Sequence, residues 1–445
     1  MALWFGQAML ADGWRRDVRV TITDGRIAGV EPGVKPQSED ERHGIALPGL
    51  PNVHSHAFQR GMAGLAEQAG PGGDSFWTWR VAMYRFVDRL DPEGLRAIAA
   101  LAYVEMLESG FTRVGEFHYL HHDPAGAPYG DRAEMARAIV EAAKDSGIGL
   151  TLLPVFYAHA GFGGVAPEAG QRRFVNGVDG FAQLVEGARD ALAGIDGGVI
   201  GIAPHSLRAV TQAQLAAVLP LASGGPVHIH VAEQRAEVDA CLAWGGQRPV
   251  EWLFDHAPVD ARWCLIHATH ATEAELAAVA RSGAAVGLCP ITEANLGDGI
   301  FPARAFLGRG GRIGVGSDSN VRIDAAGELC LLEYGQRLTH RARNMLAGGG
   351  GGLWRACLAG GAQALGQERA GLAVDAPADI VSLRADDVAL VGRSGDRLID
   401  SWLFGGRALV DCVWRGGAKR VSGGVHVARA GVEARYRTVM QALLA

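Results

Sequence analysis

Two histidines separated by one residue, His54 and His56, follow a short apolar run at residues 44–50. The run reads as a buried strand, and in extended backbone residues i and i+2 point to the same side, so both imidazoles can reach one ion. Histidine is the commonest metal ligand, but the chain has 15 histidines, and such a pair equally fits two packed, hydrogen-bonded side chains. Further potential metal ligands at the ends of other strands would favour a metal site over a pair of packed histidines.

Eight short apolar runs alternate with helical segments along the middle of the chain. Asp91 and Pro92 begin one helix, which Gly110 ends. Thr272 and Glu275 form a capping box that begins another. Eight such units predict an α/β fold, a closed (β/α)8 TIM-type barrel. An open doubly wound sheet is the alternative, but no glycine-rich nucleotide fingerprint follows the first run. The eight runs are residues 44–53, 112–117, 149–156, 198–203, 226–231, 262–267, 284–288 and 312–317.

Both ends of the chain have a different pattern. Asp24 and Gly25 separate two alternating runs, a strong hairpin signal, and residues 379–383 and 408–414 also read as strands. We therefore expect a small β-sandwich domain built from residues 1–45 and 375–425, a barrel at 46–374 and a C-terminal helix at 426–445. The glycine run at 348–352 follows no strand and reads as a flexible loop.

Polar residues fall where a barrel places its active site, at the carboxyl ends of the strands. Three imidazoles and one carboxylate would suit Zn²⁺, or Fe²⁺ as second choice, with water in the open position. Taken singly, Asp318 reads equally as a helix cap, His267 as a core histidine and Glu233 as a surface charge. Their joint occurrence at the expected strand ends is improbable as coincidence. In strand order these residues are His54, His56, Glu116, His118, Tyr119, His205, Arg208, His228, His230, Glu233, His267 and Asp318.

The fifth run offers two histidines, His228 and His230, which alternation places on the same side. His230 is the predicted ligand because it is the one with Glu233 three residues later, beyond the strand end. His228 is then a packed histidine behind the site.

The composition is that of an ordinary globular protein, with 48% hydrophobic and 20% charged residues. The net charge of -6 argues against a nucleic-acid or anionic-membrane surface, so an anionic ligand must be bound by local arginines. Six scattered cysteines without a CxxC pair suit free thiols in a reducing cytosol. With no signal-peptide pattern and no apolar run of about 18 residues, we expect a cytoplasmic protein without membrane spans.

The ligand pattern resembles that of the amidohydrolase superfamily. His-x-x-Glu after the fifth run is similar to its deaminase branch with one metal, and no lysine stands at a strand end to bridge two metals. Over nearly the whole chain, through residue 365, the sequence resembles the formimidoylglutamate deiminases, although residues 321–328 depart by an Ala-Ala-Gly stretch. The similar stretches are NVHSHAFQRGMAGLAE at 52–67, DSFWTWR at 74–80, EFHYLHH at 116–122, HSLRAV at 205–210, HVAEQ at 230–234, HATH at 267–270, TEANLGD at 292–298 and GSDS at 316–319.

This resemblance implies hydrolysis of N-formimino-L-glutamate to N-formyl-L-glutamate and ammonia, a step of histidine degradation, by a cytoplasmic homodimer with one Zn²⁺ per chain. It implies that Asp318 takes the proton of water, Glu233 protonates the leaving nitrogen and His267 orients the hydroxide or stabilises the tetrahedral intermediate. The implied metal ligands are His54, His56, His230 and Asp318, and the implied carboxylate-binding residues are Gln59, Arg80, Tyr119, His205 and Arg208.

Two rival functions stay open at this point. A mononuclear zinc deaminase of a purine or pyrimidine would need aromatic stacking and few cations, which Arg80 and Arg208 disfavour. A catalytically inactive barrel serving as a scaffold is disfavoured by the complete ligand set with Glu233. The simplest alternative for Arg80 alone is a surface ion pair.

Overall fold

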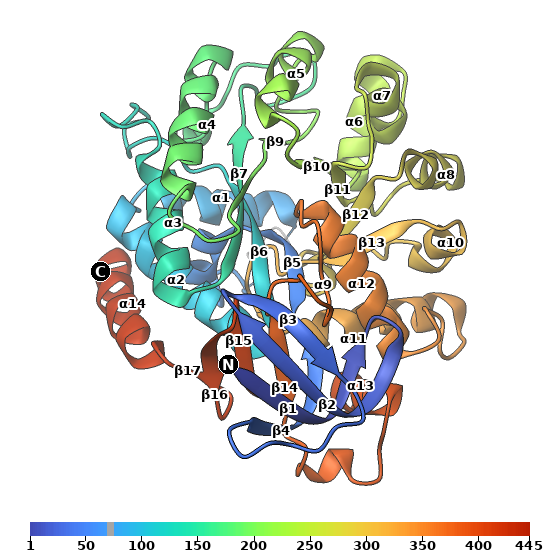
Figure 1. Cartoon of the computed structure of the whole chain (residues 1–445). Helices are drawn as coiled ribbons and strands as arrows, with labels where there is room; N and C mark the ends of the chain where they lie inside the picture. The colour runs from blue at the N-terminus through green and yellow to red at the C-terminus, as the bar shows by residue number, and fades with distance from the viewer. Residues whose placement is uncertain (69–74) are drawn as a thin grey trace.

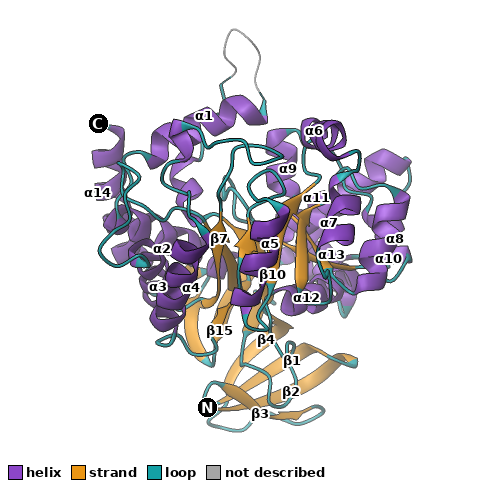
Figure 2. Cartoon of the chain, turned by 90° about the horizontal axis from the view of Figure 1, so that it is seen from above, coloured by secondary structure: helices purple, strands orange, loops and turns teal. Residues whose placement is uncertain are grey.

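The computed structural model describes residues 1–68 and 75–445 as a barrel and a separate sheet (Figure 1). Asp74, the first residue of the stretch at 74–80, lies outside the described residues. Figure 2 shows the small sheet on one side of the barrel and helix α1 (Phe76–Val87) on the opposite side.

The small sheet combines strands from both ends of the chain, as predicted. Hydrogen bonds connect all eight strands in the order β17-β16-β15-β14-β4-β1-β2-β3. Asp24 and Gly25 both adopt positive φ, 48° and 75°, at the predicted hairpin between β2 and β3. The strands are β1 (Ala2–Leu10), β2 (Gly13–Thr23), β3 (Arg26–Glu31), β4 (Glu41–Pro48), β14 (Ile380–Leu383), β15 (Val410–Arg415), β16 (Ala418–Ser422) and β17 (Val425–His426).

The barrel strands are all parallel, in the order β10-β11-β12-β13-β5-β6-β7-β8, with β9 beside β7. Bridges from Ile202 to Val227 and from Ser206 to His230 close the ring. The predicted TIM-type barrel is therefore confirmed. Its strands are β5 (Leu50–Ser55), β6 (Phe111–His118), β7 (Gly149–Phe156), β8 (Val199–Ile200), β9 (Ala203–Pro204), β10 (Val227–Val231), β11 (Trp263–His267), β12 (Ala285–Leu288) and β13 (Arg312–Val315).

Two of the predicted strands are divided by a glycine. The run at 44–53 is not one strand, because it changes sheets at Gly49, where a Cβ would lie 2.2 Å from Thr112 Cγ2. The run at 198–203 is interrupted at Gly201, where a Cβ would lie 2.3 Å from the Pro226 carbonyl oxygen. β4 thus spans the boundary predicted at residues 45 and 46, and we propose that the small domain extends through Pro48.

Helices follow most barrel strands and surround the barrel. Asp91 accepts a hydrogen bond from Gly94 at the start of α2, and the predicted capping box of Thr272 and Glu275 begins α8. Besides α1, the helices are α2 (Pro92–Ser109), α3 (Glu134–Ser146), α4 (Val178–Leu192), α5 (Gln212–Val218), α6 (Arg235–Gly245), α7 (Pro249–His256), α8 (Glu273–Ser282), α9 (Pro290–Leu296), α10 (Ala303–Gly308), α11 (Ala325–His340), α12 (Gly350–Ala364), α13 (Asp396–Gly405) and α14 (Arg429–Leu444), with short 3-10 turns η1 (Ala57–Met62), η2 (Ala169–Gln171), η3 (Leu219–Ala222) and η4 (Val388–Leu390).

The glycine run at 348–352 was wrongly predicted to be a loop throughout. Helix α12 begins at Gly350, inside the run, and a Cβ on Gly352 would lie 1.8 Å from the Ala347 carbonyl oxygen. The glycines therefore permit a close backbone approach at a helix start. The atypical stretch at 321–328 is also a helix start, where Asp324 accepts a hydrogen bond from Gly327 at 2.8 Å.

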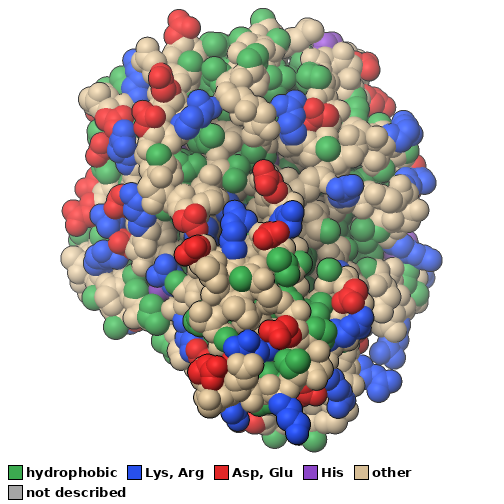
Figure 3. Space-filling model, viewed as in Figure 1, with side chains coloured by type: hydrophobic (Ala, Val, Ile, Leu, Met, Phe, Trp, Pro, Cys, Tyr) green, Lys and Arg blue, Asp and Glu red, His purple; other side chains and the backbone are tan. Residues whose placement is uncertain are grey.

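The surface gives two further observations. Among the described residues, no helix combines the length and the apolar character needed to cross a bilayer. Figure 3 shows basic and acidic side chains intermixed over one face of the molecule, so that face has no extended basic region of the kind a polyanion would bind.

Candidate metal centre and substrate cavity

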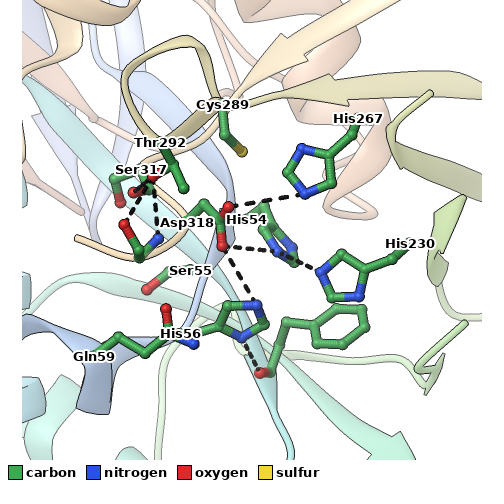
Figure 4. A network of polar contacts seen from close by, with 12 residues as sticks. His54, Ser55, His56, Gln59, His230, His267, Cys289, Thr292, Ser317 and Asp318 are labelled. Carbon is green, nitrogen blue, oxygen red and sulfur yellow. Dashed lines mark hydrogen bonds and ion pairs between the residues drawn. The ribbon is translucent and has the colours of Figure 1, made fainter. Parts of the chain in front are cut away.

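The first and last barrel strands bring three predicted ligands together. The backbone N–H of His56 donates to the Asp318 carbonyl and that of Asp318 to the His54 carbonyl, each at 2.9 Å. This pairing places Asp318 Oδ1 3.5 Å from His54 Nε2 and 3.4 Å from His56 Nε2 (Figure 4). All three side chains are buried.

A polar network holds Asp318 in its backbone conformation. Asp318 and Asn320 have φ of 44° and 55°, in the left-handed region that non-glycine residues rarely adopt. The Asn320 side-chain amide donates to Ser55 Oγ and to the carbonyl oxygens of His56 and Asp318, while Asn52 bonds Ser317. These hydrogen bonds stabilise the strained turn and fix the position of the Asp318 carboxylate.

His230 completes the group from the opposite side of the barrel. Its Nδ1 lies 3.0 Å from the His205 carbonyl oxygen, and that of His56 lies 2.9 Å from the Phe117 carbonyl oxygen. The other nitrogen of His230 lies 3.1 Å from His54 Nε2 (Figure 4). With Nδ1 bonded to backbone, each ring directs Nε2 at the centre, as ligand histidines do.

The donor set fits a divalent cation. Burial lowers the pKa of His54 to about 3 and lowers the pKa of His56 and of His230, so these rings are neutral and keep a lone pair. Burial alone would raise the pKa of Asp318, but the hydrogen bond of His54 and the nearby imidazoles lower it, so the carboxylate is ionised. Three imidazoles and a carboxylate are a common zinc donor set.

His54 belongs to two candidate ligand groups, one with His56 and Asp318 and one with His230 and His267. His267 differs from the other rings. Burial opposes its charge, but the carboxylates of Glu233 and Glu293 raise its pKa to about 10. A charged imidazolium has no lone pair for a metal, which distinguishes His267 from the three neutral rings. His228, in contrast, lies behind the site, with Nε2 2.7 Å from the Ala364 carbonyl oxygen.

Glu233 follows β10 on a tight turn that Glu237 holds. Both carboxylate oxygens of Glu237 accept backbone N–H groups, from Ala232 at 3.3 Å and Glu233 at 3.1 Å. Glu233 Oε1 lies 3.7 Å from His267 Nε2, and burial raises the pKa of Glu233 to about 7. A carboxyl group with such a pKa can both accept and release a proton near neutral pH.

The five residues predicted to bind carboxylates line one cavity with Glu233, His267 and Asp318. Gln59 donates to the Tyr119 hydroxyl at 2.8 Å, His205 lies 3.1 Å from Ser206 Oγ, and Arg80 lies 3.9 Å from Glu168. Arg208 enters the same lining from the loop after β9. His56 and His230 also face the cavity, and His54 lies behind them, fully buried.

Sequence reasoning missed other lining residues. Tyr157 and Phe174 belong to the long connection after β7, and Trp79 and Tyr84 come from α1, so the strand-end rule had no signal for them. Thr292 and Leu296 lie within the quoted stretch at 292–298, Trp79 within that at 74–80 and Ser319 within that at 316–319, so these residues had a signal by resemblance alone. The unpredicted lining residues are Trp79, Met83, Tyr84, Tyr157, Phe174, Thr292, Leu296 and Ser319.

Comparisons of the sequence agree with this geometry. The profile described as "Amidohydrolase family" matches residues 45–414, and that described as "Formimidoylglutamate deiminase HutF, N-terminal domain" matches residues 2–44. A curated formimidoylglutamate deiminase from Pseudomonas aeruginosa is 51% identical over 99% of this chain and 98% of its own. An 8-oxoguanine deaminase from the same species is 29% identical over 96% of this chain and 95% of its own.

Two solved structures share this fold, one at high and one at low sequence identity. An amidohydrolase from Brucella melitensis superposes with a TM-score of 0.98 at 53% identity, covering 100% of both chains. An adenosine deaminase from Xanthomonas campestris with bound zinc gives 0.83 at 22% identity, covering 100% of this chain and 98% of that one, and supports the fold alone. The chain therefore belongs to the amidohydrolase family and, within it, to the formimidoylglutamate deiminases.

Proposed function

We propose that this enzyme hydrolyses N-formimino-L-glutamate to N-formyl-L-glutamate and ammonia, a step of histidine degradation, through the roles assigned to its cavity residues below. The observation that carries the proposal is that Arg80 and Arg208 line the same cavity as Glu233, His267 and Asp318. The substrate joins an amidine to two carboxylates, and this cavity combines proton-transfer groups with two guanidinium groups.

Proton transfer is assigned to the two carboxylates. Asp318 is ionised because its pKa lies below the ordinary range, so it can accept one proton of water as the water oxygen bonds to the amidine carbon. The C=N double bond opens toward the nitrogen, which Glu233, with a pKa of about 7, protonates. The hydroxyl proton then passes through Glu233 to the same nitrogen as the formyl C=O forms, the C–N bond breaks and ammonia leaves, and the proton held by Asp318 restores Glu233. His267 lies 3.7 Å from Glu233 and 3.8 Å from Asp318, between the two, and stabilises the negative charge that develops.

The two carboxylates of the substrate require cationic and hydrogen-bonding partners in the cavity. Arg208 with His205 and Tyr119 would hold one carboxylate, and Arg80 with Gln59 the other. A guanidinium binds a carboxylate with two parallel hydrogen bonds, which fixes orientation as well as charge. The pair of arginines therefore favours a dicarboxylate over a neutral nucleobase.

The family is metal-dependent, and the proposed metal is one Zn²⁺ per chain, held by His54, His56, His230 and Asp318, with Fe²⁺ as the alternative. When bound, zinc acts as a Lewis acid that lowers the pKa of water to about 7. The neutral imidazoles and ionised carboxylate support this assignment.

We also propose a cytoplasmic homodimer. All six cysteines are free thiols in the described structure, which suits a reducing compartment. Tyr436, Val439, Met440 and Leu443 of α14 pack against the core of this chain, and the exposed Leu444 beside them supports an interface at this end of the helix. Sedimentation of the purified protein measures the oligomeric state directly.

The test of the reaction is ammonia release from N-formimino-L-glutamate compared with adenine, guanine and cytosine. We expect release from the amidine alone, because the bases lack carboxylates for Arg80 and Arg208. Faster release from a nucleobase would reject the proposal in favour of a purine or pyrimidine deaminase.

A further inference from the structure

Glu293 lies on the far side of His267 from the reacting groups. Its Oε1 is 3.1 Å from His267 Nδ1, whereas Glu233 and Asp318 face His267 Nε2. The same Oε1 accepts the backbone N–H of Cys289 at 3.0 Å, and the backbone N–H of Glu293 donates to the Cys289 carbonyl at 2.8 Å. The carboxylate is buried and held by the first turn of α9.

We infer that Glu293 is a positioning residue that fixes the orientation of the His267 imidazole for deimination. The inference rests on the catalytic role proposed for His267. A carboxylate oxygen beside Nδ1 requires that nitrogen to carry hydrogen, which leaves Nε2 for the reacting side of the ring. Without this acceptor, a rotation of the ring by half a turn about the Cβ–Cγ bond would put Cδ2 in the place of Nδ1 and Cε1 in the place of Nε2, so that a carbon atom would face the reacting groups.

Other contacts of His267 do not set this orientation. Its ring stacks on that of His230, with an interplanar angle of 12° and centroids 5.6 Å apart, which restrains the plane of the ring. Stacking is equally compatible with the half-turn rotamer, so it does not decide whether Nε2 or Cε1 faces the cavity. His267 and Ala268 also have positive φ, 69° and 47°, so regular strand geometry does not direct the side chain. The bond to Glu293 is the contact that distinguishes Nδ1 from Cδ2, since Glu233 and Asp318, at 3.7 and 3.8 Å, lie beyond hydrogen-bond distance of Nε2.

The chain offers a matched control in Glu328 of α11, a second buried carboxylate that contacts the start of α9. Its Oε2 accepts the N–H of Ile291 at 2.9 Å, one residue after Pro290, and nothing places it in the catalytic machinery. Glu328→Leu therefore reproduces the loss of a buried carboxylate that caps this helix, without removing a contact to His267.

The first experiment compares zinc-loaded Glu293→Leu, Glu293→Gln and Glu328→Leu. Glu293→Leu should lower kcat about 10- to 100-fold, as losses of such supporting partners do, with KM within about twofold and the zinc content unchanged. Glu293→Gln should recover most of the loss, because an amide oxygen still accepts from Nδ1. A parental kcat in folded Glu293→Leu, or an equal loss in Glu328→Leu, would overturn the inference. If the leucine variant does not fold, Glu293→Ala replaces it.

A double-mutant cycle with His267→Asn separates this inference from the proposed mechanism. In the His267→Asn background, Glu293→Leu should change kcat by less than about twofold, because a positioning residue has nothing left to position. If the losses in kcat of the two single variants multiplied in the double variant, the inference would be contradicted. A parental kcat in His267→Asn would reject the catalytic role of His267 and the inference with it, whereas an inactive His267→Asn beside a fully active Glu293→Leu would reject Glu293 alone.

Discussion

At the scale of single residues, the site depends on carboxyl groups whose surroundings move their pKa values apart. Burial raises the pKa of Glu233 to about 7, while neighbouring imidazoles overcome the burial of Asp318 and keep it ionised. Groups of one chemical type can therefore hold different protonation states a few ångströms apart. That difference assigns the proton donor and the proton acceptor.

The proton-donor role of Glu233 is tested by Glu233→Gln. The amide keeps the shape of the side chain but cannot donate a titrating proton, so kcat should fall about 10²- to 10⁴-fold. Binding of zinc and of substrate should persist, because Glu233 is neither a proposed ligand nor a carboxylate-binding residue. Retention of most of the parental kcat would remove Glu233 from the mechanism.

The assignment of the two arginines predicts selective losses. Replacing Arg208 or Arg80 by Met removes a charge-assisted contact of roughly 1.5 to 3 kcal/mol, which lowers kcat/KM about ten- to hundredfold. The two variants should respond to opposite analogues, one lacking the α-carboxylate and one the side-chain carboxylate. Arg262→Met, which breaks an exposed pair with Asp260, serves as the control. Parental kcat/KM in both cavity variants would show that the dicarboxylate pocket is misassigned.

At the scale of elements, the carboxyl ends of β5 and β6 share a buried carboxylic acid. Glu116 on β6 accepts the backbone N–H of Ala57 at 2.7 Å, and burial raises its pKa to about 8. From about pH 4.5 to about pH 8 the folded protein keeps a proton that the unfolded chain has lost. The contribution of Glu116 to stability therefore falls as pH rises through this window, by at most about 1.4 kcal/mol per pH unit.

Glu116→Gln carries no such proton, so its stability should decline less with rising pH. The measurement is the thermal midpoint of parent and variant across that window. We expect the thermal midpoint of the variant to rise relative to that of the parent as the pH approaches 8. Parallel curves would show that Glu116 is already ionised in the folded protein.

The success of sequence reasoning also varies with the element. The ends of β5, β10, β11 and β13 were predictable because strand periodicity and the position of one polar residue are local properties. The division of two strands at Gly49 and Gly201 was not, because it depends on Thr112 and Pro226, which are distant in sequence. Glu293 lies in the stretch quoted at 292–298, but strand periodicity gave it no role, since it lies in a helix and reaches the site through His267.

At the scale of the whole molecule, the metal connects distant parts of the barrel, because its proposed ligands come from β5, β10 and the turn after β13. A ligand that binds the folded state alone stabilises it by mass action. Zinc removal should therefore lower the thermal midpoint and abolish turnover, and elemental analysis should find one metal per chain. Two metals per chain, or none after loading with zinc, would contradict the assignment.

The crossing at Gly49 has a consequence for synthesis of the chain. β4 ends at Pro48, but its neighbour β14 begins at Ile380, so one edge of the first four strands has no partner until the barrel has been made. At about 5 to 20 residues per second, the ribosome leaves that edge uncovered for roughly 20 to 60 s. An unpaired edge strand invites pairing with other chains. The nascent chain is therefore most prone to aggregate during that interval. A truncated chain that ends before β14 keeps the edge of β4 unpaired permanently and stays prone to aggregate.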